Sequence, residues 1–274
     1  MSGARAAEPT RLTDDGRLKM DPVFVNDGAA VVFTVLETPT QTSLVRLQLA
    51  DGRQERLHPK ATTAEFEATF SADDRYCAYV QSRGNLSLRL VIDDTRDDKQ
   101  YFFEPGGGFS GMRHPSISAA AGRVVFSIPR AGGQQIVAAN LQAADRKELT
   151  QGDSLNFWPS YSPDERSIAF GSSRDGDFDI YLMNADGGDV RRLTESPGRD
   201  MRPAWSPDGR RIAFTSSRDR NTEIYVIATD GAGLLRITDH PEQDDYACWH
   251  PDGKRMAVVS ERSGKFDLYL VDVP

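Results

Sequence analysis

Cysteine and long apolar runs are both scarce in this sequence. Its 274 residues include two cysteines, Cys77 and Cys248, which are too few for a disulfide framework. Both lie in apolar, strand-like runs, so we expect two buried free thiols. No run of about 18 apolar residues occurs, so no membrane insertion is predicted. The start of the chain carries Arg5 but no apolar core, so it does not match a signal peptide.

Basic residues and histidines are also in short supply. Lysine and arginine number 33 against 41 acidic residues, which gives a formal net charge of −8. Nucleic-acid-binding domains show a basic footprint, so no nucleic-acid partner is expected. The four histidines do not form the H-E-x-x-H pattern of zinc proteases. Phosphate-binding loops, dinucleotide fingerprints and complete G-x-S-x-G elbows are missing too, and no catalytic residue is assigned.

What the chain does contain is a repeat. A strand that ends in a Pro-Asp turn recurs, and Pro163, Pro207 and Pro251 are spaced 44 residues apart. Three eroded copies are centred on Phe33, Tyr79 and Phe126. Each copy holds four short strand signals at a spacing of about 45 residues, which is typical of one propeller blade. We therefore predict an all-β, six-bladed propeller of four-stranded antiparallel blades, without helices.

The two ends of the chain predict how the ring closes. The sixth copy stops after its third strand, so it lacks the Arg-Ile-Thr or Arg-Leu-Thr strand that ends the copies before it. The N-terminus supplies this strand as Arg11-Leu12-Thr13, which we expect to complete the last blade and leave no open edge. The predicted single domain covers residues 1–274, with blades at 21–58, 67–104, 114–150, 158–194, 202–238, and 246–273 together with 9–13.

Residues that recur in every copy solve a problem that every blade shares, so we interpret them as structural. Bulky side chains at the end of each first strand are predicted to pack between neighbouring blades. They are Phe24, Phe70, Ile117, Tyr161, Trp205 and Trp249. The repeated Arg174, Arg218 and Arg262 are expected to bond loop carbonyls or nearby carboxylates in their own blades.

Function is expected where the copies differ, at the start of the innermost strands, which rim one mouth of the channel. Two sets of aligned positions lie there, with Arg113, Phe157 and Asp245 between them. The first set is Lys19, Glu65, Met112, Asn156, Asp200 and Asp244, and the second is Asp21, Glu67, His114, Trp158, Arg202 and Tyr246. Since Trp, Tyr and Arg dominate binding energetics, we predict a partner-binding surface here, with a solvated rim as the alternative. The predicted contact residues are Glu65, Glu67, Arg113, His114, Asn156, Trp158, Asp200, Arg202, Asp244 and Tyr246.

Two acidic groups are candidates for a calcium site, although no cofactor is required by the pattern. The loop Asp175–Asp179 has alternating carboxylates, but it lacks the glycine and glutamate of an EF-hand and coincides with a repeat turn. The mouth carboxylates could instead hold calcium in the channel; they are Glu65, Glu67, Asp200 and Asp244. Before the third blade, the glycine-rich segment Glu104–Phe109 is predicted to be a loop on the mouth side.

The repeat W-S-P-D-G-x-x-I-A-F at 205–214, followed by Glu223–Tyr225 and Leu235–Thr238, resembles the repeat of TolB-type β-propellers. The resemblance extends over the chain from Thr10 onwards. TolB propellers are periplasmic and bind the peptidoglycan-associated lipoprotein at one face. The resemblance therefore implies a protein or peptide partner at the channel mouth and a periplasmic location. We expect a monomeric, non-catalytic binding module.

Two features of the sequence depart from a complete TolB protein. There is no room for the α/β domain that precedes the TolB propeller, and no export signal is present, so we expect a stand-alone propeller. The repeat is also similar to propellers of prolyl-oligopeptidase-type peptidases and of oligogalacturonate lyases. The alternative function is therefore a lyase or hydrolase acting on an anionic saccharide, using His114, Arg113 and Arg202 for acid–base work. The acidic net charge favours the binding module, because it repels an anionic substrate.

Overall fold

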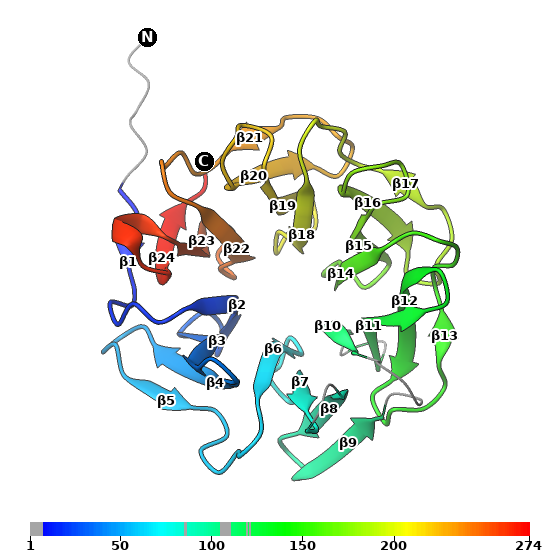
Figure 1. Cartoon of the computed structure of the whole chain (residues 1–274), viewed down its shortest axis with the longest axis horizontal. Helices are drawn as coiled ribbons and strands as arrows, with labels where there is room; N and C mark the ends of the chain where they lie inside the picture. The colour runs from blue at the N-terminus through cyan, green and yellow to red at the C-terminus, as the bar shows by residue number, and fades with distance from the viewer. Residues whose placement is uncertain (1–7, 85–86, 105–110, 119, 121) are drawn as a thin grey trace.

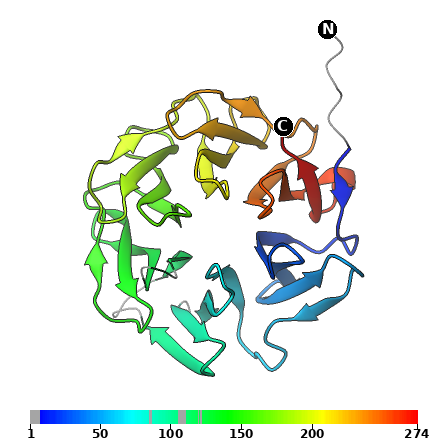
Figure 2. The ribbon, with the colours of Figure 1, turned by 180° about the vertical axis from the view of Figure 1, so that it is seen from behind.

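The strands of this chain form a closed ring of blades around a central axis. The computed structural model describes residues 8–84, 87–104, 111–118, 120 and 122–274. In this part of the chain the strands make six four-stranded antiparallel sheets, and Figure 1 shows them arranged like the blades of a propeller. The view from behind shows the same closed ring (Figure 2). The predicted six-bladed, all-β propeller is thereby confirmed.

Each blade begins with its innermost strand and ends with its outermost one. Blade one has β2 (Lys19–Val25), β3 (Ala30–Thr38), β4 (Gln41–Gln48) and β5 (Gln54–Arg56); blade two has β6 (Glu65–Phe70), β7 (Tyr76–Ser82), β8 (Leu88–Asp94) and β9 (Lys99–Phe103); blade three has β10 (Arg113–Ser118), β11 (Arg123–Arg130), β12 (Gly133–Asn140) and β13 (Lys147–Glu148). Blade four has β14 (Asn156–Tyr161), β15 (Ser167–Ser172), β16 (Asp179–Asn184) and β17 (Arg191–Arg192); blade five has β18 (Asp200–Trp205), β19 (Arg211–Ser216), β20 (Glu223–Ala228) and β21 (Leu235–Arg236); blade six has β22 (Asp244–Trp249), β23 (Arg255–Ser260), β24 (Asp267–Asp272) and β1 (Thr10–Arg11).

The bulky residue at the end of each first strand packs against the blade before it, as predicted. Trp249 of blade six belongs to a buried cluster with Ala213 and Val226 of blade five. The indole of Trp205 packs on blade four, and its Nε1 donates a hydrogen bond of 3.0 Å to the carbonyl of Ser160. Equivalent clusters join the other neighbouring blades. The core is therefore a set of interfaces between blades.

The N-terminal strand completes the last blade, which confirms the predicted closure. β1 pairs antiparallel with β24, with Thr10 opposite Leu270 and Arg11 opposite Tyr269. The carboxylate of Asp267, at the start of β24, accepts hydrogen bonds from Arg11 at 2.6 Å and from the hydroxyl of Thr13 at 2.8 Å. The segment before β2 thus closes the ring through both backbone pairing and side chains.

The same carboxylate also ties blade six to blade one. Lys19, the first residue of β2, is fully buried, and its Nζ lies 2.9 Å from Asp267. Lys19 bonds Asp15 as well, which lies between β1 and β2. The buried ion pair between Lys19 and Asp267 therefore joins β24 to β2, and the hydrogen bond from Arg11 to Asp267 joins β24 to β1.

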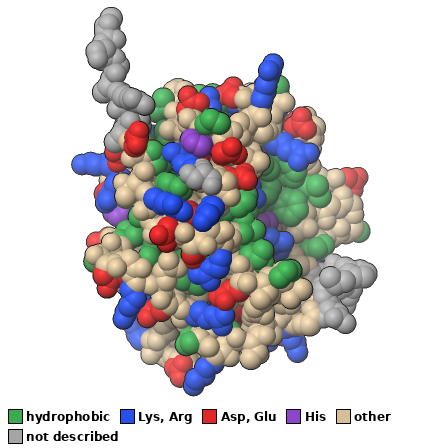
Figure 3. Space-filling model, turned by 60° about the vertical axis from the view of Figure 1, so that its left-hand side comes forward, with side chains coloured by type: hydrophobic (Ala, Val, Ile, Leu, Met, Phe, Trp, Pro, Cys, Tyr) green, Lys and Arg blue, Asp and Glu red, His purple; other side chains and the backbone are tan. Residues whose placement is uncertain are grey.

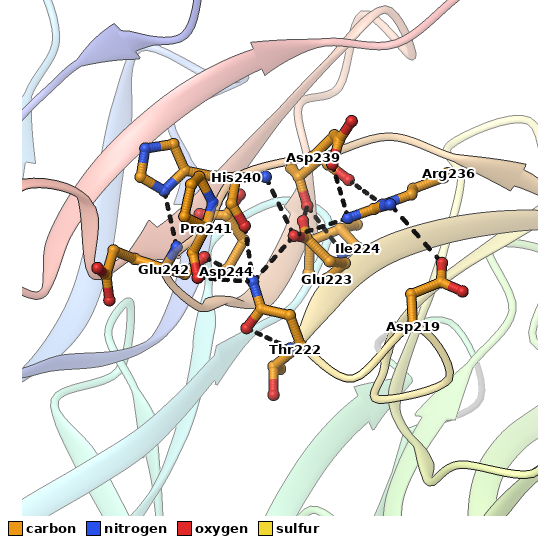
Figure 4. Close-up of polar contacts among 12 residues, drawn as sticks. Asp219, Thr222, Glu223, Ile224, Arg236, Asp239, His240, Pro241, Glu242 and Asp244 are labelled. Carbon is orange, nitrogen blue, oxygen red and sulfur yellow. Dashed lines mark hydrogen bonds and ion pairs between the residues drawn. The ribbon is translucent and has the colours of Figure 1, made fainter.

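Internal blades repeat the bonding that closes the ring. We call this arrangement the outer-strand cluster: an acidic residue that begins the third strand, bonded by an arginine and a threonine from the outermost strand. In blade five, Glu223 accepts hydrogen bonds from Arg236 at 3.0 Å and from Thr238 at 2.5 Å. Figure 4 shows Arg236 between Glu223 and Asp219. The closure of the ring therefore uses the same side-chain hydrogen bonds as a blade that is built from one continuous segment.

Three smaller expectations have different outcomes. One short 3₁₀ turn, η1 (Arg262–Gly264), stands where no helix was predicted, because this copy has Glu261-Arg262-Ser263-Gly264 in place of the usual loop. Both cysteines are free, but Cys77 is buried whereas Cys248 is half-buried, since it borders the channel. The loop predicted at 104–109 lies outside the described residues from position 105 onwards.

Among the described residues, no helix has the length and apolar character needed to cross a membrane.

Candidate functional site

Each innermost strand bulges at the same aligned position. The six bulge residues have φ between 49° and 56°, a region that is uncommon for residues other than glycine. They are Asp21, Glu67, His114, Trp158, Arg202 and Tyr246, and we call them the bulge ring. The ladder register shifts at every one of them. Since a bulge changes the direction of a side chain, it explains how these six side chains come to line the channel.

The residue after the bulge supplies a local reason for its position. Proline follows in four blades, as Pro22, Pro115, Pro159 and Pro203. A proline has no N–H to give to the sheet ladder, so it is tolerated where a bulge interrupts pairing. The proline therefore marks where the bulge interrupts strand pairing, whereas the residue before it differs between blades.

The bulge ring separates two cavities along the channel. All six residues border an inner cavity of about 210 Å³, which also contacts the strand residues that follow the bulge. All six also border a second cavity of about 590 Å³, the mouth cavity, on the side where the innermost strands begin. The mouth cavity extends over Met20, Leu36, Phe66, Arg113 and Phe157. Figure 3 shows hydrophobic side chains gathered around a hollow, with basic and histidine side chains beside it.

Half-buried aromatic rings form one side of this mouth, which we call the aromatic wall. It consists of His114, Phe157 and Trp158, which border the mouth cavity, and of Phe178, which packs against Phe157 and Trp158. Phe157 lies against Trp158 at 5.3 Å between ring centroids, and Phe178 lies 5.5 Å from Trp158. His114 contacts Trp158 at 5.4 Å and Phe157 at 5.7 Å. Rings at these separations support one another and present a rigid apolar surface.

Two arginines carry the positive charge of the channel. Arg113 donates from Nε to Glu67 at 2.6 Å, and the backbone N–H of His114 donates to the same carboxylate at 2.6 Å. Arg202 lies 3.2 Å from Asp245 and stacks over the ring of Tyr246 at 4.2 Å. Each guanidinium group is therefore held by a carboxylate of a neighbouring blade.

Burial shifts the ionisation of several ring residues. Burial, opposed in part by Glu67, lowers the pKa of His114 to about 4, so the imidazole is neutral near pH 7. Burial also disfavours the charged form of Glu67, but the Arg113 guanidinium and the backbone N–H of His114 hold its pKa below the ordinary value. Burial raises the pKa of Tyr246 to about 12. Near neutral pH the ring and the adjacent Arg113 therefore present two arginines, an ionised Glu67 and the neutral side chains of His114 and Tyr246.

Asp21 is the exception in the ring, because its carboxylate has no hydrogen bond or ion pair with any described residue. Burial and the negative charge of Glu67 raise its pKa to about 7, although Arg202 and Arg113 act in the opposite direction. A carboxylate that lacks a partner within a channel is costly to ionise. This residue was aligned with the ring in the sequence but was not among the predicted contact residues.

Replacement of Asp21 by asparagine is expected to stabilise the protein at pH 8 by about 2 kcal/mol and to have little effect at pH 4. The folded-state pKa of Asp21, about 7, lies above the value of about 3.9 in an unfolded chain. Below about pH 4 the carboxyl group is protonated in both the folded and the unfolded state, so it does not destabilise the fold. As the pH rises through about 7, its ionisation lowers the free energy of unfolding. Urea unfolding at both pH values measures the difference.

Asp27→Asn is the matched control for this substitution. Asp27 is exposed, lies in the same blade and has a similar positive φ of 51°. We expect it to change stability equally little at both pH values. An equal gain for Asp21→Asn at pH 4 and pH 8 contradicts the assignment of an ionisation cost to this carboxylate.

The first aligned set lies deeper than the bulge ring. Glu65, Asn156, Asp200 and Asp244 are buried, with exposed fractions of 0–3%. Arg218 bonds Asp200 at 2.8 Å, Arg262 bonds Asp244 at 2.8 Å, and Arg174 bonds Asn156 at 3.2 Å. The expectation that the repeated arginines bond groups of their own blades is confirmed.

The predicted contact residues therefore fall into two groups. Glu67, Arg113, His114, Trp158, Arg202 and Tyr246 come together at the channel. Glu65, by contrast, bonds His58 at 2.7 Å and Gln81 at 3.1 Å, and like the other three buried residues it does not line either channel cavity. These four residues bond partners within their own blades. Whether the channel group binds a partner stays a prediction.

The mouth carboxylates considered for calcium are bonded by basic side chains. Glu67 pairs with Arg113, Asp200 with Arg218 and Asp244 with Arg262. In the part of the chain that the structure describes, no three His, Cys, Asp or Glu side chains converge as a metal-binding group. These residues do not fit a calcium site, and the saccharide lyase or hydrolase stays an untested alternative.

Phe178 is a wall residue that the sequence did not indicate. It lies in the acidic loop Asp175–Asp179, where the alternating carboxylates drew the interpretation towards calcium. In the aligned loop of blade five the same position is Thr222. This difference between copies was the available signal, because an apolar ring in a polar loop needs a packing partner.

Comparisons with known proteins agree with this geometry. The family model for the TolB beta propeller domain matches residues 46–201, which is more than half of the chain. The chain belongs to the TolB β-propeller domain family. A second model, the N-terminal beta propeller domain of Tricorn protease, matches residues 184–273 of this TolB-like propeller. A comparison with curated protein sequences gives no match.

Solved structures share the fold at low sequence identity. The putative TolB from Agrobacterium tumefaciens superposes with a TM-score of 0.74 at 21% identity, over 96% of this chain and 93% of that one. TolB from Acinetobacter baumannii gives 0.69 at 18% identity, over 90% of this chain and 65% of that one. An oligogalacturonate lyase in complex with manganese gives 0.64 at 15% identity, over 99% and 95%. At these identities the likeness concerns the fold alone.

Proposed function

We propose that this TolB-like propeller is a non-catalytic binding module that holds a segment of a protein partner at the mouth cavity. The observation that carries the proposal is the aromatic wall, in which the half-buried rings of His114, Phe157 and Trp158 border a cavity of about 590 Å³. Aromatic residues and arginine are enriched at the energetic centres of protein interfaces. Arg113 and Arg202 border the same cavity.

The charges of the mouth favour a peptide segment over a small anionic substrate. Each guanidinium group already has an acidic neighbour, since Arg113 bonds Glu67 and Arg202 lies 3.2 Å from Asp245. Neither therefore offers a free positive charge to a uronate. A peptide can instead bury apolar side chains against the wall and leave its polar backbone towards the rim. The periplasmic location and the monomeric state stay predictions of the family resemblance.

Selection of displayed peptides on the wild-type protein tests this proposal. Peptides that bind the mouth are expected to lose about 30-fold in affinity for Trp158→Asn, which corresponds to about 2 kcal/mol for one aromatic anchor. Asparagine is chosen because it accepts the positive φ of 52° at this position, so the bulge is retained. Fluorescence anisotropy with labelled peptides measures the affinities.

Leu235→Ala is the control, because Leu235 is an exposed side chain on the outermost strand of blade five. It is expected to leave peptide affinity unchanged. Selected peptides that bind Trp158→Asn as tightly as wild type, or a selection that enriches no peptide, contradict the proposed site.

A further inference from the structure

The bulge ring contains one carboxylate that has no partner among the described residues. The carboxylate of Asp21 has no hydrogen bond or ion pair among the described residues, and it borders both the inner and the mouth cavity. An unpaired carboxylate that borders a cavity favours a cationic ligand, because an opposite charge nearby stabilises its ionised form.

The remaining charges of the ring are already matched. Glu67 is held by Arg113 and by the backbone N–H of His114, and Asp245 accepts from Thr215 and lies beside Arg202. Three carboxylates, those of Asp21, Glu67 and Asp245, face two guanidinium groups in this region. With all of them ionised, the ring lacks one positive charge, and the unpaired carboxylate is that of Asp21.

We propose that the bulge ring binds a primary ammonium group of the partner polypeptide, with the Asp21 carboxylate accepting its N–H bonds. This inference rests on the proposed function and specifies which part of the partner enters the channel. Binding of an ammonium group requires little rearrangement of the site, because the bulges hold the ring in place.

The shape of the channel suits this ligand. An ammonium group is compact and presents three donors, whereas the apolar part of the same segment can lie against Trp158 and Phe157 in the mouth cavity. The inner cavity beyond the ring, at about 210 Å³, is smaller than the mouth cavity of about 590 Å³. The arrangement therefore favours an end-on approach from the mouth.

Binding is expected to weaken as the pH falls through about 7. The groups that face Asp21 are Glu67, Arg113, Arg202 and Asp245, with His114 and Tyr246 completing the ring. Glu67 stays ionised and His114 and Tyr246 stay neutral in this range, so Asp21 is the ring member that changes charge. Its carboxylate attracts an ammonium group only when it is ionised.

Three small probes separate the two sources of a primary ammonium group. Phenylalaninamide carries an α-ammonium, Nα-acetyl-lysinamide carries a side-chain ammonium, and N-acetylphenylalaninamide carries none. The readout is the indole N–H signal of Trp158 in nitrogen-15 NMR spectra, assigned with Trp158→Phe. Trp205 and Trp249 serve as internal references, because their indoles donate to the carbonyls of Ser160 and Ala204 between blades.

A saturable shift with phenylalaninamide, absent with the acetylated analogue, supports recognition of a chain terminus. A shift with the lysine probe alone supports a side-chain source of the same ammonium chemistry. In either case Asp21→Asn is expected to weaken binding at least tenfold, Asp27→Asn to leave it unchanged, and a change from pH 8 to pH 6 to reduce it several-fold.

The inference is overturned if neither ammonium probe shifts Trp158, if the acetylated probe binds equally, or if Asp21→Asn binds like wild type. The outcome is distinct from that of the peptide selection. Peptides that depend on Trp158 but bind Asp21→Asn normally leave the binding module intact and remove only the ammonium contact.

Discussion

Removal of residues 1–13 is expected to lower the melting temperature by about 10 °C, which corresponds to a loss of roughly 4–5 kcal/mol. The deletion takes away β1, which pairs with β24, and the apolar contact of Leu12 with the cluster between blades six and one. It also leaves Asp267 buried with Lys19 as its remaining basic partner, because the bonds from Arg11 and Thr13 are lost. Thermal unfolding followed by circular dichroism measures the change.

Removal of residues 1–7 alone is the control for this experiment, since it retains every contact made by Arg11, Leu12 and Thr13. A synthetic peptide of residues 8–18, added to the shortened protein, is expected to restore part of the lost stability in proportion to its concentration. An unchanged melting temperature for the 1–13 deletion means that the N-terminal strand contributes little to closure.

Replacement of Arg218 by alanine is expected to cost about 3 kcal/mol in the free energy of unfolding, because it leaves a buried carboxylate without its charge partner. Asp200 is fully buried, and Arg218 approaches its two oxygens at 2.8 and 3.0 Å. The guanidinium also lies 4.8 Å from the ring centroid of Tyr225, so packing is lost as well. Urea unfolding gives the free energy.

A second substitution distinguishes lost charge pairing from lost packing. In the Arg218→Ala background, Asp200→Asn is expected to recover about half of the loss, because blade four already places the neutral Asn156 at this position. Arg210→Ala, at an exposed side chain of the same blade, is the control and should change stability by less than about 0.5 kcal/mol. A loss for Arg218→Ala that is no greater than for Arg210→Ala contradicts the structural role.

The fold was predictable because the repeat states it several times. The Pro-Asp turns at 163, 207 and 251 fix the blade length, and Arg11-Leu12-Thr13 matches the outer strands of other blades. The structure adds the chemical reason: the arginine and threonine of this motif bond the acidic residue at the start of the third strand. Local sequence was sufficient here, since each blade solves the same packing problem.

The bonding of the first aligned set within each blade was not predicted, because its members differ in residue type. Asn156, Asp200 and Asp244 are alternative ways to bond the same arginine, and the arginine follows each of them at a constant separation of 18 residues. That constant separation was the available signal of a structural pair. Differences between copies indicate function only where the chemistry differs too, as it does at Glu67, His114 and Arg202.

The lack of a partner for Asp21 could not be predicted from the sequence. Whether its carboxylate is bonded depends on how far Arg113 and Arg202 reach from blades three and five, and each is held elsewhere, by Glu67 and by Asp245. Which carboxylate each arginine bonds depends on how the blades lie in space, and no fixed spacing in the sequence indicates it. It is decided by the geometry of the closed ring.

The shared sixth blade sets an order for the biogenesis of this protein. Its sheet joins Thr10–Arg11 to Asp267–Asp272, so a nascent chain on the ribosome cannot complete it until the last strand has emerged. Tyr246, on the innermost strand of that blade, contributes to the same ring as Asp21. A translation product that stops before Asp267–Asp272 therefore lacks a complete sixth blade and an assembled channel.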